Sequence, residues 1–269
     1  MHFLISPAKT LDYERAILQV APTRPRFLTH SAELIDVLRR KTSGEIAELM
    51  DLSEALATLN VARYAAWSKR FTDRNSRPAV LAFDGDVYVG LNAGTLGQAD
   101  LAWAQQHVSI LSGLYGLLRP LDRMQAYRLE MGTALATQRG KNLYEFWGDT
   151  LARQLNRQMA GQKPAVIVNL ASQEYFRAVQ HRGLKGRVIE CVFEDWKDSA
   201  AGSGYKVISF FAKRARGLML RYAIEKRLAA PQGLTRFRSE GYRFEAAVSA
   251  PERLVFRRRG HGDPAESNE

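Results

Sequence analysis

The sequence has little of what a disulfide-bonded or membrane-spanning protein needs. Its 269 residues include one cysteine, Cys191, so no disulfide can form within the chain. Cys191 lies in the apolar run 188–193, which favours a buried, unreactive thiol. No run of about 18 apolar residues occurs, so we expect no transmembrane helix and no membrane partner.

The first seven residues also lack the features of a signal peptide. The apolar run there is short and has no basic flank. We therefore expect a cytoplasmic protein.

Motifs for metal binding and for common catalytic chemistry are missing as well. Asp84 and Asp86 flank Gly85, but no third carboxylate or histidine follows at ligand spacing, so this segment predicts a turn. No nucleophile elbow, dinucleotide fingerprint or Walker loop occurs. We expect no metal and no cofactor, because no histidine has a cysteine or carboxylate at a recognised spacing; the histidines are His2, His30, His107, His181 and His261.

Positive charge is what the sequence has in excess. Lys and Arg number 39 against 28 Asp and Glu, a formal net charge of +11. The last nine residues carry three acids and no Lys or Arg, so setting them aside raises the charge from +11 to +14. Such a charge attracts polyanions, although a solvated basic surface without a partner would have the same composition.

Apolar patterning predicts interspersed helices and strands, and hence a mixed α/β (α+β) fold. No linker divides the chain, so we expect one compact domain over residues 1–258, with a helical lobe at about 31–70 and a disordered acidic tail at 259–269. The expected strands are 2–6, 79–83, 108–111, 165–170, 186–196, 205–211, 241–248 and 252–258. The expected helices begin near Ser31, Ser43 and Ser53 and cover 98–107, 143–160 and 212–229.

The helix expected at 212–229 carries the densest basic cluster. Only one carboxylate, Glu225, lies within it, so most of its charge has no local partner. This pattern favours contact with phosphates, and the alternative is a solvated face whose long side chains lie along the surface. The cations are Lys213, Arg214, Arg216, Arg221, Lys226 and Arg227.

Two other segments could bind an anion. The turn 6–10 follows the first strand directly and offers backbone N–H groups and the side chain of Lys9, although a proline turn with a surface lysine explains it equally. The glycine-rich segment 112–120 and the segment 127–132 add basic side chains, and Tyr115 and Tyr127 offer faces on which bases could stack. The alternative for the tyrosines is ordinary core packing. The arginines in these segments and between them are Arg119, Arg123 and Arg128.

Taken together, these segments resemble the YaaA family of bacterial peroxide-stress resistance proteins over residues 1–258. The resemblance rests on several long motifs in the same order. They are 4–11 (LISPAKTL), 82–88 (AFDGDVY), 111–122 (LSGLYGLLRPLD), 127–132 (YRLEMG), 146–148 (FWG), 169–172 (NLAS) and 212–219 (AKRARGLM).

The resemblance implies a compact fold of unusual topology with a positively charged cleft. It implies binding of DNA, including distorted or partly single-stranded duplexes, through that cleft and a helix-hairpin-helix element. It further implies a role in limiting oxidative DNA damage and free intracellular iron under peroxide stress. No catalytic residue and no protein partner carries over.

The hairpin element is expected within 43–67, where Asp51-Leu52-Ser53 would join two short helices. DNA-binding hairpins of this kind usually contain glycine, whereas the nearest glycine here is Gly44. The direct phosphate contact of such a motif is therefore not predicted by these residues.

Two classes of function follow. In the first, the protein binds DNA without strong sequence preference, with phosphates on Lys9, Arg119, Arg128, Lys213, Arg214, Arg216 and Arg221, and bases on Tyr115 or Tyr127. In the second, it is an enzyme acting on damaged nucleic acid or a nucleotide, with Lys9 as a Schiff-base nucleophile and Glu130 as acid or base. The missing ligand cluster indicates that any effect on iron is indirect.

Overall fold

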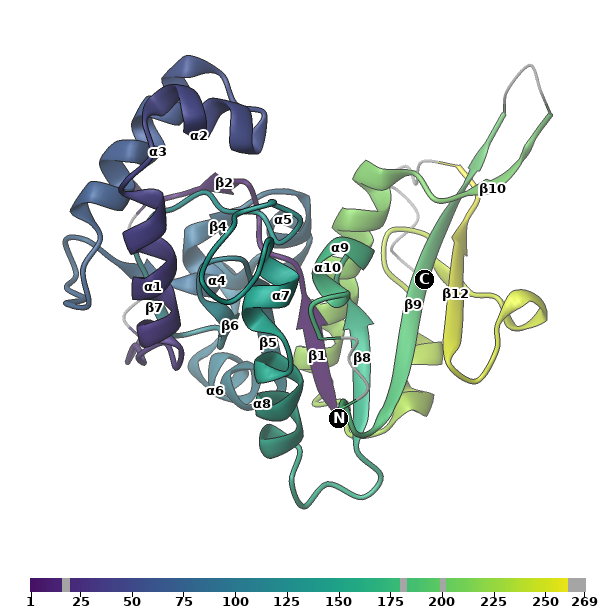
Figure 1. The fold of residues 1–269 in the computed structure, drawn as a ribbon. Helices are drawn as coiled ribbons and strands as arrows, with labels where there is room; N and C mark the ends of the chain where they lie inside the picture. The colour runs from purple at the N-terminus through teal and green to yellow at the C-terminus, as the bar shows by residue number, and fades with distance from the viewer. Residues whose placement is uncertain (16–19, 180–182, 199–201, 261–269) are drawn as a thin grey trace.

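The computed structural model describes residues 1–15, 20–179, 183–198 and 202–260. The tail predicted at 259–269 therefore lies, from residue 261 onward, outside the described residues. Among the described helices, none is long and apolar enough to span a membrane. The fold is mixed α/β, as predicted, and is built around one large sheet (Figure 1).

The large sheet has the strand order β11-β12-β9-β8-β1-β5-β6, and β10 pairs with β9 outside this path. Strands β5, β1, β8, β9 and β12 run parallel to one another, while β6, β10 and β11 are antiparallel to their neighbours. Its strands are β1 (His2–Ile5), β5 (Val108–Ser112), β6 (Gly116–Leu118), β8 (Val166–Leu170), β9 (Arg187–Lys197), β10 (Gly204–Lys206), β11 (Arg243–Phe244) and β12 (Arg253–Arg258).

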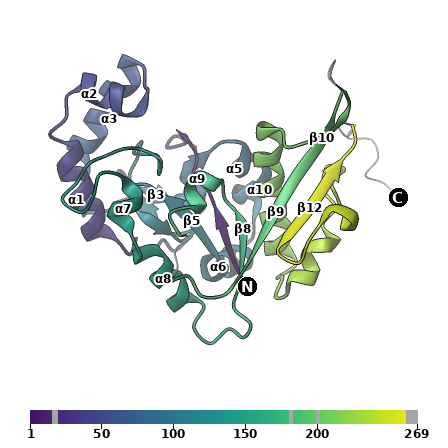
Figure 2. The same ribbon diagram turned by 45° about the vertical axis from the view of Figure 1, so that its right-hand side comes forward.

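The central strands are buried along their whole length. Every residue of β1, β5 and β8 is buried, which requires cover on both faces of the sheet. Helices supply that cover, with α10 contacting β9 and α6 on one face and α8 and α9 lying over the other (Figures 1 and 2). These helices are α6 (Gln98–His107), α7 (Leu143–Trp147), α8 (Thr150–Gln158), α9 (Gln173–Phe176) and α10 (Ser209–Glu225).

Helix α10 packs against α5 (Asp86–Leu91) through two glycines. A Cβ added at Gly217 would lie 1.9 Å from the carbonyl oxygen of Val87, and one added at Gly90 would lie 2.2 Å from that of Arg214. Backbone therefore meets backbone at this crossing, and no larger residue fits. The contact fixes α10 beside the Asp84-Gly85-Asp86 turn that precedes α5.

The helical lobe lies at one end of the molecule, away from β9 and β12 (Figure 1). It consists of α1 (Leu28–Leu38), α2 (Ser43–Met50) and α3 (Glu54–Ala66). Thr42 and Glu45 form a capping box at the start of α2, and Ser53 caps α3. Residues Asp51 to Ser53 join α2 and α3 as predicted, with Asp51 in the left-handed conformation.

Several predicted elements are wrong in type or length. Residues 79–83 form helix α4 (Ala79–Ala82) and a short strand β4 (Phe83–Asp84) that pairs with β2 (Thr10–Leu11). The helix expected at 143–160 is interrupted at Gly148, which has φ of +43°. The strand expected at 205–211 ends at 206 because α10 begins at 209, and only 243–244 of the segment 241–248 is strand. A further two-stranded sheet pairs β3 (Arg77–Pro78) with β7 (Arg123–Met124), and η1 (Ala93–Thr95), η2 (Pro231–Arg236) and η3 (Ala246–Val248) complete the fold.

Candidate nucleic-acid interface

Polar side chains gather where the central parallel strands end. Ser6 follows β1, Ser112 ends β5 and Ser172 follows β8, so the three lie at the same edge of the sheet. Ser6 Oγ accepts a hydrogen bond of 2.9 Å from the Ser172 N–H and donates one of 3.3 Å to Ser172 Oγ. Carboxyl ends of parallel strands are the usual ligand sites of open α/β sheets.

Lys9, Arg128 and Glu130 meet beside this edge. Lys9 Nζ lies 3.1 Å from Glu130 Oε2, and Arg128 Nη2 lies 2.8 Å from Glu130 Oε1. The Lys9 side chain is 66% exposed and that of Arg128 only 16%. Two segments far apart in the sequence thus place two cations on one carboxylate, with Lys9 facing solvent.

The backbone around Glu130 is held from several sides. The Tyr64 hydroxyl donates to the carbonyl of Arg128, and the N–H of Gly132 donates to Glu174 Oε1 at 2.9 Å. Burial is the main cause that raises the pKa of Tyr175, and the carboxylates of Glu174 and Glu130 add to it. Tyr175 is therefore a neutral hydrogen-bonding group beside the cluster across the physiological pH range.

The stacking role predicted for Tyr115 and Tyr127 is wrong for this structure. Tyr115 is fully buried and Tyr127 is 5% exposed, and their rings pack edge to face with centroids 5.3 Å apart. The Tyr115 hydroxyl accepts from Trp67 Nε1 at 2.9 Å, and that of Tyr127 bonds with Ser112 Oγ at 2.6 Å. Their faces are covered by the core, so the alternative of core packing holds.

Part of the charge of the segment 212–229 is paired with carboxylates from outside it, whereas within the segment the sequence offers only Glu225. Arg214 Nε in α10 lies 2.9 Å from Glu240 Oε1, and Nη2 of Arg227, which follows the end of α10, lies 2.7 Å from Asp100. The hydrogen bond that Arg214 donates to Glu240 is the main cause that raises the pKa of Arg214. These carboxylates come from distant segments, which local counting of charges cannot reveal.

Arg221 and Arg119 are engaged in the fold. Arg221 Nη1 donates to the carbonyls of Leu91 and Asn92 at the end of α5, and its Nε lies 2.8 Å from Glu225. A cation at a helix C-terminus stabilises the unpaired carbonyls there. Arg119 donates to Asp122, which is fully buried. These contacts hold both side chains against the fold, and the interface proposed below does not depend on them.

Lys213 is the exposed cation that remains near the start of α10, while Arg216 is half-buried. Burial lowers the pKa of Arg216, and the nearby carboxylate of Glu190 acts in the opposite direction. The turn that carries Lys9 packs against the turn at Gly85, which lies beside α10. A Cβ added at Gly85 would lie 3.2 Å from the Cβ of Ala8, the residue before Lys9. Lys9 and the N-terminal half of α10 therefore flank the same turn.

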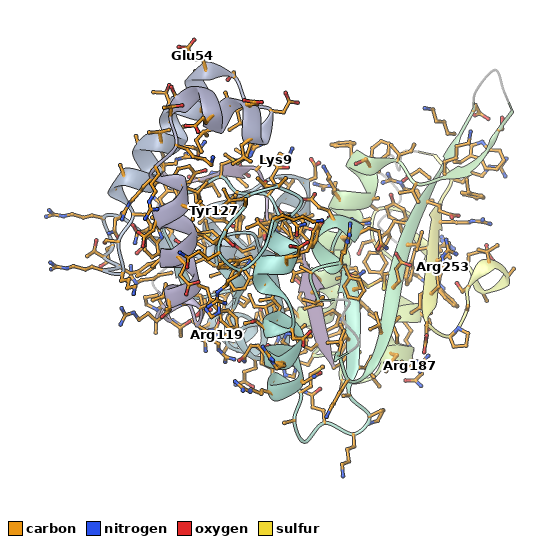
Figure 3. The ribbon with its side chains drawn as sticks, viewed as in Figure 1. Lys9, Glu54, Arg119, Tyr127, Arg187 and Arg253 are labelled. Carbon is orange, nitrogen blue, oxygen red and sulfur yellow. The ribbon has the colours of Figure 1, made fainter. Side chains whose placement is uncertain are left out.

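Lys9 and Arg119 do not share one surface. Figure 3 places Lys9 beneath the helical lobe, whereas Arg119 lies at the opposite end of that half of the molecule, with the buried Tyr127 between them in this view. The sequence grouped Arg119 with Arg128 because Arg119 lies in the glycine-rich segment 112–120 and Arg128 in the nearby segment 127–132. The folded chain separates them.

The α2–α3 hairpin carries the opposite charge to the one expected of a phosphate-binding motif. Residues 42–62 contain no Lys or Arg and four acids, which are Glu45, Glu48, Asp51 and Glu54. Glu54 lies at the tip of the lobe (Figure 3). The tip would repel a phosphate backbone, so the hairpin itself is a poor site for direct contact.

One basic residue near the cluster was missed by the sequence reasoning. Arg63, in the last turn of α3, is half-buried and close enough to Arg128 for the two charges to interact. Arg63 is a single basic residue within an apolar helical pattern, so nothing in the sequence marked it as a phosphate-binding residue. A pocket of about 580 Å³ next to Arg63 has mixed charge, since its lining includes Asp12, Glu14 and Asp84 as well as Arg15.

Neither the cysteine nor the histidines form a reactive or metal-binding centre in the described part of the chain. Burial raises the pKa of Cys191 to about 12, which agrees with the predicted inert thiol. Within the residues that the structure describes, no three His, Cys, Asp or Glu side chains lie close enough together to hold a metal ion.

These features define a mixed α/β protein with a polar, basic cluster at the carboxyl ends of its parallel strands. Its sequence matches the family model described as "Peroxide stress protein YaaA" over residues 1–248. It is 61% identical over 259 residues to a UPF0246 protein of Bordetella petrii, covering 96% of this chain and 100% of that one. A UPF0246 protein of Polaromonas naphthalenivorans is 62% identical over 258 residues, covering 96% and 98%. The chain belongs to the YaaA peroxide stress protein family.

Proposed function

We propose that this peroxide stress protein binds DNA without strong sequence preference and limits oxidative damage to it in the cytoplasm. The observation that carries the proposal is the cluster at the sheet edge, where Lys9 and Arg128 both contact one carboxylate, Glu130, and Arg63 lies close enough to Arg128 for their charges to interact. Lys213 adds an exposed cation across the Gly85 turn. Lys and Arg side chains on one surface are the usual contacts for a phosphate backbone.

The charge of the whole protein supports the same proposal. A net charge of +11 produces a long-range attraction for polyanions, which raises association rates and non-specific affinity. Because the buried tyrosines offer no stacking face, the binding we propose depends on phosphates rather than on bases. It should therefore discriminate weakly between sequences.

A binding series on duplex, bubble and single-stranded DNA at several salt concentrations tests this proposal. The test variant is Lys9→Ala/Arg128→Ala/Lys213→Ala, and the control is Arg153→Ala/Arg157→Ala/Lys185→Ala, which removes three exposed cations elsewhere. We expect the test variant to lose roughly tenfold or more in affinity relative to the control. Equal losses in both variants would contradict the proposed interface.

A second candidate is an enzyme acting on damaged nucleic acid or a nucleotide, favoured by the 3.1 Å contact between Lys9 and Glu130. In this reaction Glu130 accepts a proton from the Lys9 ammonium, and the amine attacks an aldehyde carbon of an oxidised or abasic sugar. Glu130 then returns its proton to the hydroxyl group of the carbinolamine. That group leaves as water, and a protonated Schiff base remains.

Borohydride trapping on abasic DNA tests the lysine mechanism. A covalent adduct that is lost in Lys9→Arg would support it, since arginine keeps the charge but is not a nucleophile. Absence of any adduct with the wild-type protein would remove this mechanism and leave the binding proposal unaffected.

We propose that any effect on intracellular iron is indirect. Among the residues that the structure describes, no three His, Cys, Asp or Glu side chains lie close enough together to hold an iron ion. Stoichiometric binding of ferrous iron at micromolar affinity would contradict this proposal.

A further inference from the structure

A second basic site lies apart from the Lys9 cluster, in the loop between α3 and β3. It is an open pocket of about 460 Å³ whose lining contains four cations and no carboxylate. The lining residues are Pro22, Thr23, Arg24, Lys69, Arg70, Phe71 and Arg123. The pocket beside Arg63, by contrast, includes three acids, so this one has the charge that an anion requires.

Side chains hold the loop that forms the pocket in place through hydrogen bonds to its backbone. Gln125 bonds to both the N–H and the carbonyl of Ser68, and Arg24 Nη2 donates to the carbonyl of Lys69 at 3.0 Å. Asn75 Nδ2 donates to the carbonyl of Arg70 at 2.9 Å. Because these bonds use backbone atoms of Lys69 and Arg70, their charged side chains remain available to a ligand.

The opposite wall is equally fixed. The Thr23 N–H donates to the carbonyl of Leu121, and the Arg123 N–H donates to the carbonyl of Thr23, each at 2.8 Å. The side chain of Arg123 is bound by Asp73, a carboxylate that is 87% exposed. Two tied segments therefore face each other across the pocket, and little ordering is needed for a ligand to bind.

The charge in the pocket is largely uncompensated. The side chains of Lys69 and Arg70 are exposed, and neither makes an ion pair with any residue that the structure describes. Phe71 is half-buried and gives the pocket one aromatic wall beside these cations. An anion attached to a flat or apolar group would contact both the cations and the aromatic ring. The phosphate of a nucleotide is an anion of this kind.

We propose that this pocket binds the phosphate of a nucleotide, either free or within a nucleic-acid strand. Lys69 and Arg70 contact the phosphate, Arg24 and Arg123 add to the local positive potential, and Phe71 packs against the sugar or base. The volume falls within the range of small-molecule sites, which run from about 300 to 1,000 Å³. The pocket shares no residue with the interface proposed above, so either proposal can fail without the other.

The test uses the full chain with two probes, fluorescein-labelled dT12 followed by anisotropy and dAMP followed by calorimetry. The variant is Lys69→Ala/Arg70→Ala, and the matched control is Arg153→Ala/Arg157→Ala, which removes two exposed cations from α8. We expect the variant to lose roughly tenfold in affinity for dT12 and to show a salt slope shallower by about 1.4, the value for two phosphate contacts on a single strand. The control should change affinity by less than about twofold.

The two probes separate the sources of the phosphate. Binding of dAMP that depends on Lys69 and Arg70 identifies a free nucleotide as a ligand, whereas loss confined to dT12 identifies a strand. If neither probe binds the wild-type protein, or if variant and control lose equally, the proposal is overturned. A Lys9→Ala/Arg128→Ala protein serves as a cross-check, because it tests the sheet-edge interface while leaving this pocket intact. Thermal melting of each variant confirms that it is folded.

Discussion

The Nζ of Lys9 lies 3.1 Å from Oε2 of Glu130, although the two residues are 121 positions apart. Glu130 also binds Arg128, so one carboxylate holds two of the cations that the proposed interface needs. The carboxylate of Glu130 therefore offsets part of the positive charge of Lys9 and Arg128. The first two predictions concern these contacts.

Glu130→Gln should strengthen DNA binding. The substitution keeps the shape of the side chain and removes the charge that competes with phosphates for Lys9 and Arg128, so both side chains should bind phosphates more strongly. We expect affinity for duplex DNA at low salt to rise roughly threefold. Glu252→Gln is the matched control, because it removes the same charge from an exposed side chain near β12. Weaker binding by Glu130→Gln would contradict the proposed arrangement.

Substitutions of Lys9 separate charge from chemistry. Lys9→Ala should weaken DNA binding by roughly three- to tenfold, because one phosphate contact is lost. Lys9→Arg should retain affinity within about twofold, since the charge remains. A binding titration at fixed salt measures both. If Lys9→Arg is as weak as Lys9→Ala, charge is not what Lys9 contributes.

Gly217→Ala should destabilise the fold through the α5–α10 crossing. The new methyl group would lie 1.9 Å from the carbonyl oxygen of Val87, so the helices must separate. We expect the free energy of unfolding to fall by about 3 kcal/mol, measured by urea denaturation. Gly94→Ala is the control, because a Cβ there meets nothing within 4 Å. A similar small change in both variants would show that the crossing is loosely packed.

His2 should make stability depend on pH. Burial is the main cause that lowers the pKa of His2 to about 3, with His107 and the N-terminal ammonium adding to it. The unfolded chain binds a proton on His2 below about pH 6.5, whereas the folded chain does not until about pH 3. Neutral His2 therefore favours the folded state at neutral pH. The part of the unfolding free energy that depends on it is lost progressively as the pH falls from 6.5 towards 3.

The variant His2→Asn separates the pH dependence of stability due to His2 from that due to other titrating groups. Between pH 6.5 and 5 we expect the wild-type protein to lose roughly 2 kcal/mol more of its unfolding free energy than the variant does. Urea denaturation at the two pH values measures it. Parallel losses in the two proteins would mean that His2 is not buried in its neutral form.

The sequence predicted the central strands, α6 and the α2–α3 hairpin because these have one clear signal each. β1 and β8 are short, largely apolar runs, and helix starts were predicted at Ser43 and Ser53. Ser53 caps α3, whereas the capping residue of α2 is Thr42, one position before Ser43. The run 79–83 was predicted as a strand because a short apolar segment does not distinguish strand from buried helix. The chain there turns into α4, whose residues Ala79, Val80 and Ala82 are all buried.

The site was predictable only in part. The Lys9 turn could be recognised as a candidate site because it follows a buried strand directly. Arg128 and Glu130 could be recognised because they lie in one short segment, 127–132. The partners of Arg214 and Arg227 could not be predicted, because Glu240 and Asp100 belong to segments distant in the sequence. Burial of Tyr115 and Tyr127 depends likewise on tertiary packing against Trp67 and Ser112. The basic pocket at Lys69 arises from two segments that only the folded chain brings together.

The most direct test of the central claim is the salt dependence of binding to duplex DNA. If Lys9, Arg63, Arg128 and Lys213 each contact a phosphate, the slope of log affinity against log salt should be about −3.6. Lys9→Ala/Arg128→Ala/Lys213→Ala should reduce its magnitude by about 2.7. A slope near zero for the wild-type protein, or an unchanged slope in the variant, would contradict the account.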